Sequence, residues 1–351
     1  MITDPTAPTV FVAPASAAPV AGRRAVVFAY HNVGARCLRV LLARGIDVAL
    51  LVTHEDNPAE NIWFESVASV AAEHDIPTIR PGPGDDALLL DAVRAAAPDF
   101  LFSFYYRNML PPAVLTLAPR GAFNLHGSLL PRYRGRVPVN WAIIHGETET
   151  GATLHEMTAK PDAGAIIGQS TVPILPDDTA HQVFEKVTVA AEQTLWQALP
   201  ALIAGTAARL PNDLAQGSYF GGRKPEDGRI DWSRPARDVY NLIRAVAPPY
   251  PGAFTDVAGD ADGADDTAAA NVGDAARAAR PTTRRFVVAD ARLAPDRPDL
   301  TNLPPGLHLV DNAFFGVCGD ARAIAIRDLR LNGEPVRADD WSRLTPPTRD
   351  S

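Results

Sequence analysis

The sequence predicts an α/β fold, with a doubly wound parallel sheet in the first half and a smaller domain of mixed α and β structure in the second. Three observations support this. Short apolar runs alternate with segments of helical periodicity, polar loops follow the ends of two of the runs, and a long helical segment at 178–205 ends at a glycine. With 351 residues, of which 46% are hydrophobic and 21% charged, the chain is long enough for two domains with cores.

The first predicted strand is AVVFAY at 25–30, and it leads through HNVG into ARCLRVLLARG, which has helical spacing and a glycine stop. The next apolar run follows at 48–52, so the three elements predict a right-handed parallel crossover. Further strands are expected at 77–80, 100–105 and 122–126. Ligands of such sheets bind beyond the carboxyl ends of the strands. HNVG stands where a dinucleotide-binding protein has G-x-G-x-x-G, which argues against NAD and ATP.

Two segments have the composition of chain that does not pack. Residues 1–22 are rich in Ala, Pro and Thr, and we predict a disordered N-terminal extension. Residues 258–281 are rich in Ala, Asp and Gly without apolar periodicity, which predicts a mobile surface insert. The domains are therefore expected at 23–206 and 207–345.

Charge and composition exclude several classes of protein. A net charge of −8 argues against a non-specific nucleic-acid or anionic-membrane binder, since both surfaces would repel the chain. The two cysteines lack zinc-type spacing, and neither these nor His31, His145 and His155 form a metal-binding pattern, so no metal is expected. No apolar run is long enough to span a membrane, and the N-terminus lacks the basic region of a secretory signal. We expect a cytoplasmic protein that acts on small molecules.

The stretch FNLHGSLLPRYRGRVP at 123–138 contains the candidate site. Side chains two apart on a strand share a face, so Asn124 and His126 should project together, opposite Phe123 and Leu125. A single histidine is more often a surface or core residue than a catalyst. Gly127 and the donor-rich loop that follows favour a functional role for His126, because they let a ligand approach closely.

The strings NLHGSLLPRYRGRVPVNWAI and HGETETGATLHEMTAKPDAGAII resemble the signature of the folate-dependent formyltransferases. The resemblance runs from about Arg23 to Phe254. It implies a Rossmann-like catalytic domain at 23–206, an OB-like β-barrel domain at 207–345, and 10-formyltetrahydrofolate as co-substrate. It also implies a catalytic triad of Asn124, His126 and Asp162. Without the resemblance, a turn residue would explain Asp162 equally well.

The chemistry fits these three residues. Formyl transfer to an amine passes through a tetrahedral carbon with an oxyanion, to which the Asn124 amide can donate a hydrogen bond. His126 can donate a second hydrogen bond and handle the proton of the attacking amine. We expect the Asp162 carboxylate to raise the pKa of His126 and to orient its ring.

The resemblance also implies which residues contact the folate. Two loops should line the pterin pocket, and the residues concerned are Asn108, Met109 and Leu110 in one, and Thr158, Ala159, Lys160, Pro161 and Asp162 in the other. For Met109 and Leu110, each taken alone, an ordinary place in the core is the more common explanation. Arg136 should meet the formyl-folate, whereas Arg132 and Arg134 are interpreted as solvated surface charges.

Within the family, the loop sequences most resemble the branch that formylates UDP-4-amino-4-deoxy-L-arabinose, in lipid A modification and polymyxin resistance. Another amino-sugar nucleotide is an alternative. A methionyl-tRNA formyltransferase is a further one, although basic and acidic residues beyond 206 are balanced at about twenty each, which suits tRNA poorly. A purine-pathway formyltransferase, a formyl-folate hydrolase and a non-catalytic folate-binding regulator fit less well. Unlike many bacterial members of this branch, the chain is expected to stand alone, without a fused dehydrogenase; its oligomeric state is left open.

Overall fold

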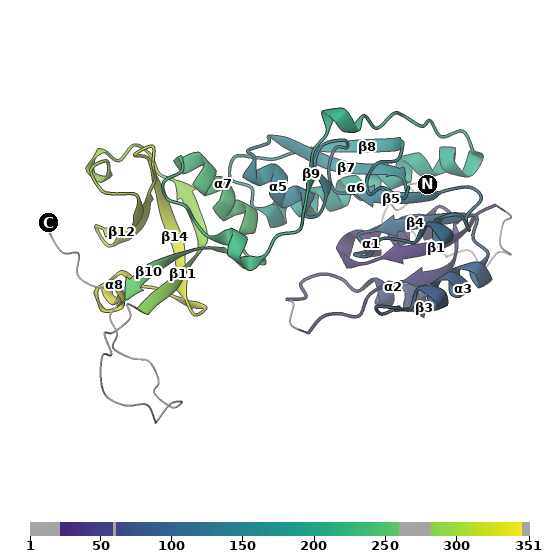
Figure 1. Ribbon diagram of the computed structural model, residues 1–351, viewed down its shortest axis with the longest axis horizontal. Helices are drawn as coiled ribbons and strands as arrows, with labels where there is room; N and C mark the ends of the chain where they lie inside the picture. The colour runs from purple at the N-terminus through teal and green to yellow at the C-terminus, as the bar shows by residue number, and fades with distance from the viewer. Residues whose placement is uncertain (1–21, 59–60, 260–281, 346–351) are drawn as a thin grey trace, which may run out of the picture.

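The computed structural model of the chain describes residues 22–58, 61–259 and 282–345, and Figure 1 shows them as two lobes along the longest axis. The N-terminal lobe contains an α/β sheet, and the C-terminal lobe contains an antiparallel sheet. The extension and the insert predicted from composition lie outside the described residues, apart from Gly22 and the end of strand β10 (Ala253–Gly259).

The N-terminal lobe is built on a seven-stranded sheet in the order β3-β2-β1-β4-β5-β7-β8. Its first five strands are parallel, whereas β7 and β8 are antiparallel to their neighbours. The sequence predicted the parallel part and did not reveal the antiparallel hairpin that extends it. The strands are β1 (Arg24–Ala29), β2 (Asp47–Val52), β3 (Thr78–Ile79), β4 (Phe100–Phe104), β5 (Ala122–His126), β7 (Glu149–Glu156) and β8 (Ile166–Pro173).

Helices cover both faces of this sheet, as expected of a doubly wound fold. Helices α1, α2 and α6 pack on one face in a large core, and α3 and α4 cover the other face in a smaller one. Strand β1 shows the alternation, because Val27 lies in the first core and Val26 and Phe28 lie in the second. The helices are α1 (His31–Ala43), α2 (Val67–Glu73), α3 (Asp86–Ala96), α4 (Pro112–Leu115), α5 (Pro138–Ile144) and α6 (Ala180–Ala204).

The long helix α6 has the ends that its sequence predicts. The Thr179 hydroxyl accepts from the backbone N–H of Gln182, whose side chain in turn accepts from the backbone of Thr179, so the two form a capping box. The helix ends at Gly205, which adopts a left-handed conformation. After the helix, the chain returns to the first domain, where β9 (Tyr219–Phe220) pairs in parallel with β6 (Arg134–Gly135). This pairing brings a distant segment over the loop that follows β5.

The C-terminal lobe is an antiparallel sheet in the order β10-β11-β14-β13-β12, with β15 paired to β14. Helix α7 packs on its apolar face, and the architecture agrees with the OB-like domain that the resemblance implies. The elements are α7 (Ala236–Val246), β11 (Thr282–Leu293), β12 (Gly306–Val310), β13 (Ala313–Val317), β14 (Ala323–Leu331), β15 (Glu334–Pro335) and α8 (Ala338–Leu344), with short 3-10 turns at Leu214–Gln216, Pro225–Gly228 and Pro298–Leu300.

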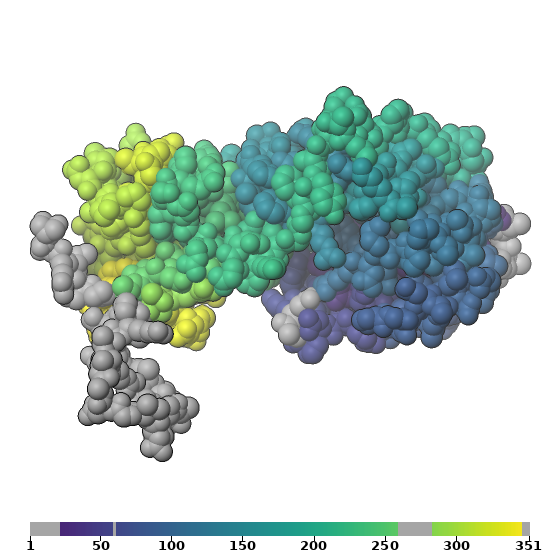
Figure 2. Space-filling view, in the orientation of Figure 1, coloured from purple at the N-terminus to yellow at the C-terminus, as the bar shows by residue number. Residues whose placement is uncertain are grey.

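The two lobes meet through helices α5 and α7, and Figure 2 shows the green connecting segment lying across the junction. The buried Asn140 amide of α5 donates to the backbone oxygen of Ala245 in α7 at 2.7 Å. The Tyr240 hydroxyl of α7 donates to the Asp177 carboxylate, in the turn before α6, at 2.7 Å. Because the buried hydrogen bond of Asn140 is costly to break, the junction holds the second lobe against the first.

Candidate active site

Strand β5 ends with Asn124 and His126 on one face of the sheet. Phe123 and Leu125 face the other way, into the core under α1 and α6. The neighbouring strand β7 runs antiparallel to β5, and its register places His155 opposite Asn124. Polar side chains from two adjacent strands therefore meet at the same edge of the sheet.

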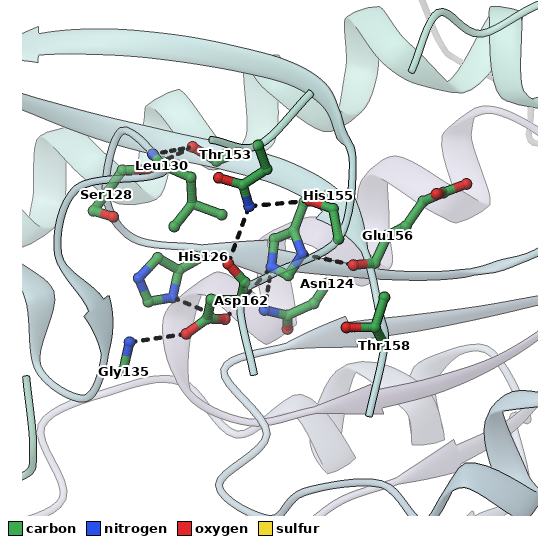
Figure 3. A network of polar contacts seen from close by, with 12 residues as sticks. Asn124, His126, Ser128, Leu130, Gly135, Thr153, His155, Glu156, Thr158 and Asp162 are labelled. Atoms are coloured by element: carbon green, nitrogen blue, oxygen red, sulfur yellow. Dashed lines mark hydrogen bonds and ion pairs between the residues drawn. The ribbon is translucent and has the colours of Figure 1, made fainter. Parts of the chain in front are cut away.

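Asp162 lies in the loop that connects β7 to β8, in a left-handed backbone conformation. Its Oδ1 atom lies 3.6 Å from His126 Nδ1 and 3.5 Å from His155 Nε2. Its Oδ2 atom accepts a hydrogen bond from the backbone N–H of Gly135 at 2.9 Å. Figure 3 shows this carboxylate between the two histidines, so the structure brings Asn124, His126 and Asp162 together.

His155 is part of this cluster. The sequence analysis considered it only as a possible metal ligand and predicted no role for it. Its Nδ1 lies 2.8 Å from the backbone oxygen of Glu156, and because a carbonyl only accepts, Nδ1 carries the hydrogen. Nε2 of the neutral ring then accepts from the Asn124 amide at 3.1 Å. This hydrogen bond fixes which way the amide of Asn124 points and leaves its second N–H free. The antiparallel pairing of β5 with β7, which places His155 opposite Asn124, is the signal that could have identified His155 as a site residue.

The tautomer of His126 follows from the same argument. Its Nε2 lies 2.8 Å from the backbone oxygen of Tyr133, so Nε2 carries the hydrogen in the neutral ring. Nδ1 is then the basic nitrogen, and it is the one that faces Asp162. The loop that supplies the Tyr133 carbonyl is itself fixed, since the Ser128 hydroxyl donates to the backbone oxygen of Arg132 at 2.7 Å.

Asp162 raises the pKa of His126, as expected, but burial has a larger and opposite effect. Burial lowers the pKa of His126 below its ordinary value, and the Asp162 charge and the Tyr133 carbonyl raise it without reversing the shift. The side chain of His126 is only 7% exposed, so the loss of solvation is the larger effect on its pKa. His126 is therefore neutral at pH 7 and can accept a proton.

Asp162 shows the opposite balance. Its burial would raise the pKa of the carboxyl, but the positive charge of His126 at acid pH, the imidazolium form of His155 and the Gly135 N–H together hold that pKa well below its usual range. The carboxylate is consequently ionised at every pH at which the protein would work. A fixed negative charge thus faces the basic nitrogen of His126.

The residues expected to contact folate lie in the loop after β4, in the loop between β7 and β8, and directly after β6. Met109 is 60% exposed and Leu110 is buried in the core under α3 and α4, so the two differ although they are neighbours. The loop before Asp162 is largely exposed, and the Thr158 hydroxyl donates to the backbone oxygen of Lys160 at 2.8 Å. Asn108, Arg136 and Ala159 are exposed, and Pro161 is half-buried.

Our interpretation of Arg134 as a solvated surface charge was wrong. Its side chain is buried, with a relative exposure of 9%, and the residue belongs to β6, which pairs with β9. Arg132 does lie at the surface, where it forms ion pairs with Glu147 at 3.4 Å and Glu149 at 3.5 Å. The pairing of β6 with a segment far along the chain explains the difference.

Two further observations concern the described residues alone. In the part of the chain that the structure describes, no group of three or more His, Cys, Asp or Glu side chains is arranged to hold a metal ion. Across the same ranges, no helix combines the length and the apolar character needed to cross a membrane.

Comparison with known families identifies the class of protein. The model of the formyl transferase family matches residues 24–199, and that of the formyl transferase C-terminal domain matches residues 223–344. The chain therefore belongs to the formyl transferase family and carries both of its domains. The predictions of a formyltransferase enzyme and of its two-domain fold are confirmed.

Solved structures share this architecture at low sequence identity. An N-formyltransferase from Helicobacter canadensis, in complex with folinic acid and dTDP-3-aminofucose, is 17% identical with a TM-score of 0.61, covering 87% of this chain and 98% of its own. A sugar N-formyltransferase from a Shewanella species is 20% identical with a TM-score of 0.53, covering 66% and 91%. HypX from Aquifex aeolicus, in complex with tetrahydrofolic acid, is 18% identical with a TM-score of 0.57, covering 91% of this chain and 46% of its own.

Proposed function

We propose that the protein transfers the formyl group of 10-formyltetrahydrofolate to the 4-amino group of UDP-4-amino-4-deoxy-L-arabinose. The observation that carries the proposal is the Asp162 carboxylate, which faces both His126 and His155 beside Asn124. This arrangement offers a hydrogen-bond donor, a neutral base and a fixed negative charge at one strand end. Those are the groups that acyl transfer to an amine requires.

Asn124 would stabilise the oxyanion. When the amine attacks the formyl carbon, negative charge develops on the formyl oxygen, and donors held in place beforehand stabilise it most effectively. One N–H of the Asn124 amide is directed at His155, so the other is available and its direction is fixed. His155 is thus a positioning residue for the donor.

His126 would move the proton. The attacking amine becomes positively charged as the new carbon–nitrogen bond forms, and its proton passes to Nδ1 of the neutral His126 ring. The imidazolium then faces Asp162, which stabilises it, and returns the proton to the folate nitrogen as the carbon–nitrogen bond to folate breaks. The products are tetrahydrofolate and the formamido sugar nucleotide, so atoms and charge balance.

Three observations support an amino-sugar nucleotide as the acceptor. The strings RGRVPVNWAI and HGETETG resemble the aminoarabinose branch of the family, and arginines follow β5 in the loop at 132–136. The similar Helicobacter and Shewanella structures are those of an N-formyltransferase with a dTDP-amino sugar and of a sugar N-formyltransferase. The acidic chain would bind tRNA poorly. Formylation would then serve lipid A modification and polymyxin resistance.

A dTDP-linked amino sugar is the second candidate, because the Helicobacter structure holds such a ligand. In the proposed mechanism the residues of the triad act only on the reacting amine and the formyl group, so they would serve either acceptor. Loops outside the triad must therefore decide between them.

Steady-state kinetics with 10-formyltetrahydrofolate and a panel of acceptors tests the proposal. We expect UDP-4-amino-4-deoxy-L-arabinose to give the highest kcat/KM, above dTDP-linked 3-amino and 4-amino sugars and far above methionyl-tRNA. A higher kcat/KM for a dTDP-linked sugar would show that this sugar is the acceptor, and the proposed formyl transfer would still stand. Formylation of methionyl-tRNA alone would overturn the amino-sugar assignment.

A further inference from the structure

Arg134 is a buried positive charge without a negative partner. The side chain is 9% exposed, and its Nε atom is buried without a hydrogen-bond partner. Among the residues that the structure describes, no carboxylate forms an ion pair with it, whereas its neighbour Arg132 pairs with two glutamates. A guanidinium does not lose its proton in proteins, so Arg134 cannot relieve its burial by becoming neutral.

The position of Arg134 ties it to the reaction centre. The preceding residue, Tyr133, accepts the hydrogen bond from His126, and the following residue, Gly135, donates to Asp162. The arginine therefore stands between the two backbone groups that hold the catalytic pair.

An exposed aromatic ring lies beside this charge. Arg134 is paired in register with Tyr219 across the parallel β6–β9 ladder, so the two side chains lie on the same face. The guanidinium carbon is 6.0 Å from the centre of the tyrosine ring, which is 57% exposed. A cation under an exposed aromatic surface suits a ligand that combines an anion with a flat ring.

Two more arginines lie in the segments that follow β6 and β9. Arg136 is exposed, and its Cδ atom packs against Gly222 of the loop after β9. In the same loop, Arg223 lies 4.9 Å over the Trp141 ring and donates to the backbone oxygen of Asp227. Within the described residues, neither guanidinium forms an ion pair with a carboxylate. Arg134 and Arg136, two residues apart in the chain, thus form a strip of two positive charges, of which Arg134 is the buried one.

We propose that Arg134 binds the diphosphate of the nucleotide-linked acceptor and that Tyr219 contacts its nucleoside. The inference rests on the proposed function, and it assigns the residue that makes the enzyme require a nucleotide-linked amine. A planar guanidinium matches phosphate oxygens in a bidentate manner. The buried charge that is unfavourable in the free protein becomes favourable once the diphosphate is bound. The glutamate carboxylates of folate are the other anion that could reach this strip, and the experiment separates the two.

Arg134→Met tests the proposal, with Arg132→Met as the matched control on the same loop. We expect Arg134→Met to raise KM for the acceptor at least about tenfold, with KM for 10-formyltetrahydrofolate unchanged. Without ligand, its melting temperature should equal or exceed that of the wild type, because an unpaired buried charge has been removed. UDP and inorganic pyrophosphate should raise the melting temperature of the wild type and of Arg132→Met, and should fail to do so for Arg134→Met.

Three results would overturn the inference. The first is a lower melting temperature of Arg134→Met together with an unchanged acceptor KM, because that pattern describes a structural arginine. The second is a rise in KM confined to 10-formyltetrahydrofolate and absent with 10-formyltetrahydropteroate, which lacks the glutamate. The third is a wild-type protein that neither UDP nor pyrophosphate stabilises. If UDP-4-amino-4-deoxy-L-arabinose is not formylated but UDP stabilises the wild type through Arg134, the inference stands and only the proposed acceptor fails.

Discussion

Two histidines with lowered pKa values, the half-buried His31 and the buried His126, lie at strand ends of the same sheet, and their surroundings differ in one decisive respect. His31 follows β1 and packs against Trp63, Phe64 and Phe184. Loss of solvation, reinforced by the charges of Arg107 and His181, lowers its pKa to about 4. His126 is buried, but a carboxylate and a carbonyl oppose the loss of solvation. Burial alone makes a histidine a poor base, and Asp162 makes His126 able to hold a proton.

The largest effect should follow removal of the reacting groups themselves. Asn124→Ala and His126→Ala should each lower kcat by about 100- to 10,000-fold, with a modest effect on folate binding, because oxyanion stabilisation and proton transfer are lost. His308→Ala, in the C-terminal lobe, is the control and should keep wild-type turnover. Near-normal kcat in either site variant would remove that residue from the mechanism.

Asp162→Asn should sharpen the contrast between the two histidines. Without the carboxylate, the pKa of His126 falls further, as at His31, so turnover should drop severely. His126 acts in its neutral form, and activity is lost as pH falls through its pKa. The acidic limb of the kcat–pH profile should therefore move to lower pH in the variant. An unshifted limb at wild-type rates would show that the charge of Asp162 is not used.

The depressed pKa of His31 predicts a pH-dependent stability. Its folded pKa of about 4 lies below the unfolded value of 6.5, so the unfolded chain binds more protons between these values. Its contribution is complete above pH 6.5 and is lost as pH falls towards 4, by at most about 3 kcal/mol. Urea unfolding of His31→Asn, which tolerates the positive φ angle, should show a flatter dependence of the unfolding free energy on pH. An equal slope in both proteins would contradict this assignment.

Gly127, directly after His126, should tolerate no side chain. A Cβ atom there would lie 2.2 Å from the hydroxyl oxygen of Tyr105, which is buried. Gly127→Ala should therefore lower the unfolding free energy by about 1–3 kcal/mol. Combining it with Tyr105→Phe removes the clashing oxygen and should restore part of the loss. If the double variant is no more stable than Gly127→Ala, the clash is not the cause.

His155 should have the smallest effect on turnover, because it acts through Asn124. His155→Leu removes the acceptor that orients the amide and should lower kcat about tenfold, with little change in KM for folate. His155→Gln offers an oxygen in place of Nε2 and should recover part of the rate. Identical rates for the two variants would indicate that the hydrogen bond to Asn124 does not matter.

The sequence predicted local features of the site better than its distant contacts. Alternation along one strand sufficed to place Asn124 and His126 on a common face. Asp162 was assigned through the resemblance, since a turn explains it locally. His155 required knowledge that β7 runs antiparallel beside β5, and periodicity does not reveal strand direction. The burial of Arg134 depends on pairing with a segment after α6, which no local pattern encodes.

The same limit applies to the balance of charges at His126. The sequence showed that a carboxylate could lie near the ring, and that predicts a raised pKa. The depth of burial is a property of the packed fold, and it outweighs the carboxylate. Motifs therefore identified the reacting groups, whereas their protonation required the three-dimensional structure.

The central claim is that the Asp162 carboxylate keeps the buried His126 basic enough to accept a proton. An NMR titration of the His126 ring, in the wild type and in Asp162→Asn, measures this directly. We predict a His126 pKa below the ordinary value of 6.5 in the wild type and a still lower pKa in Asp162→Asn. A pKa that stays the same or rises when the carboxylate is removed would contradict the claim.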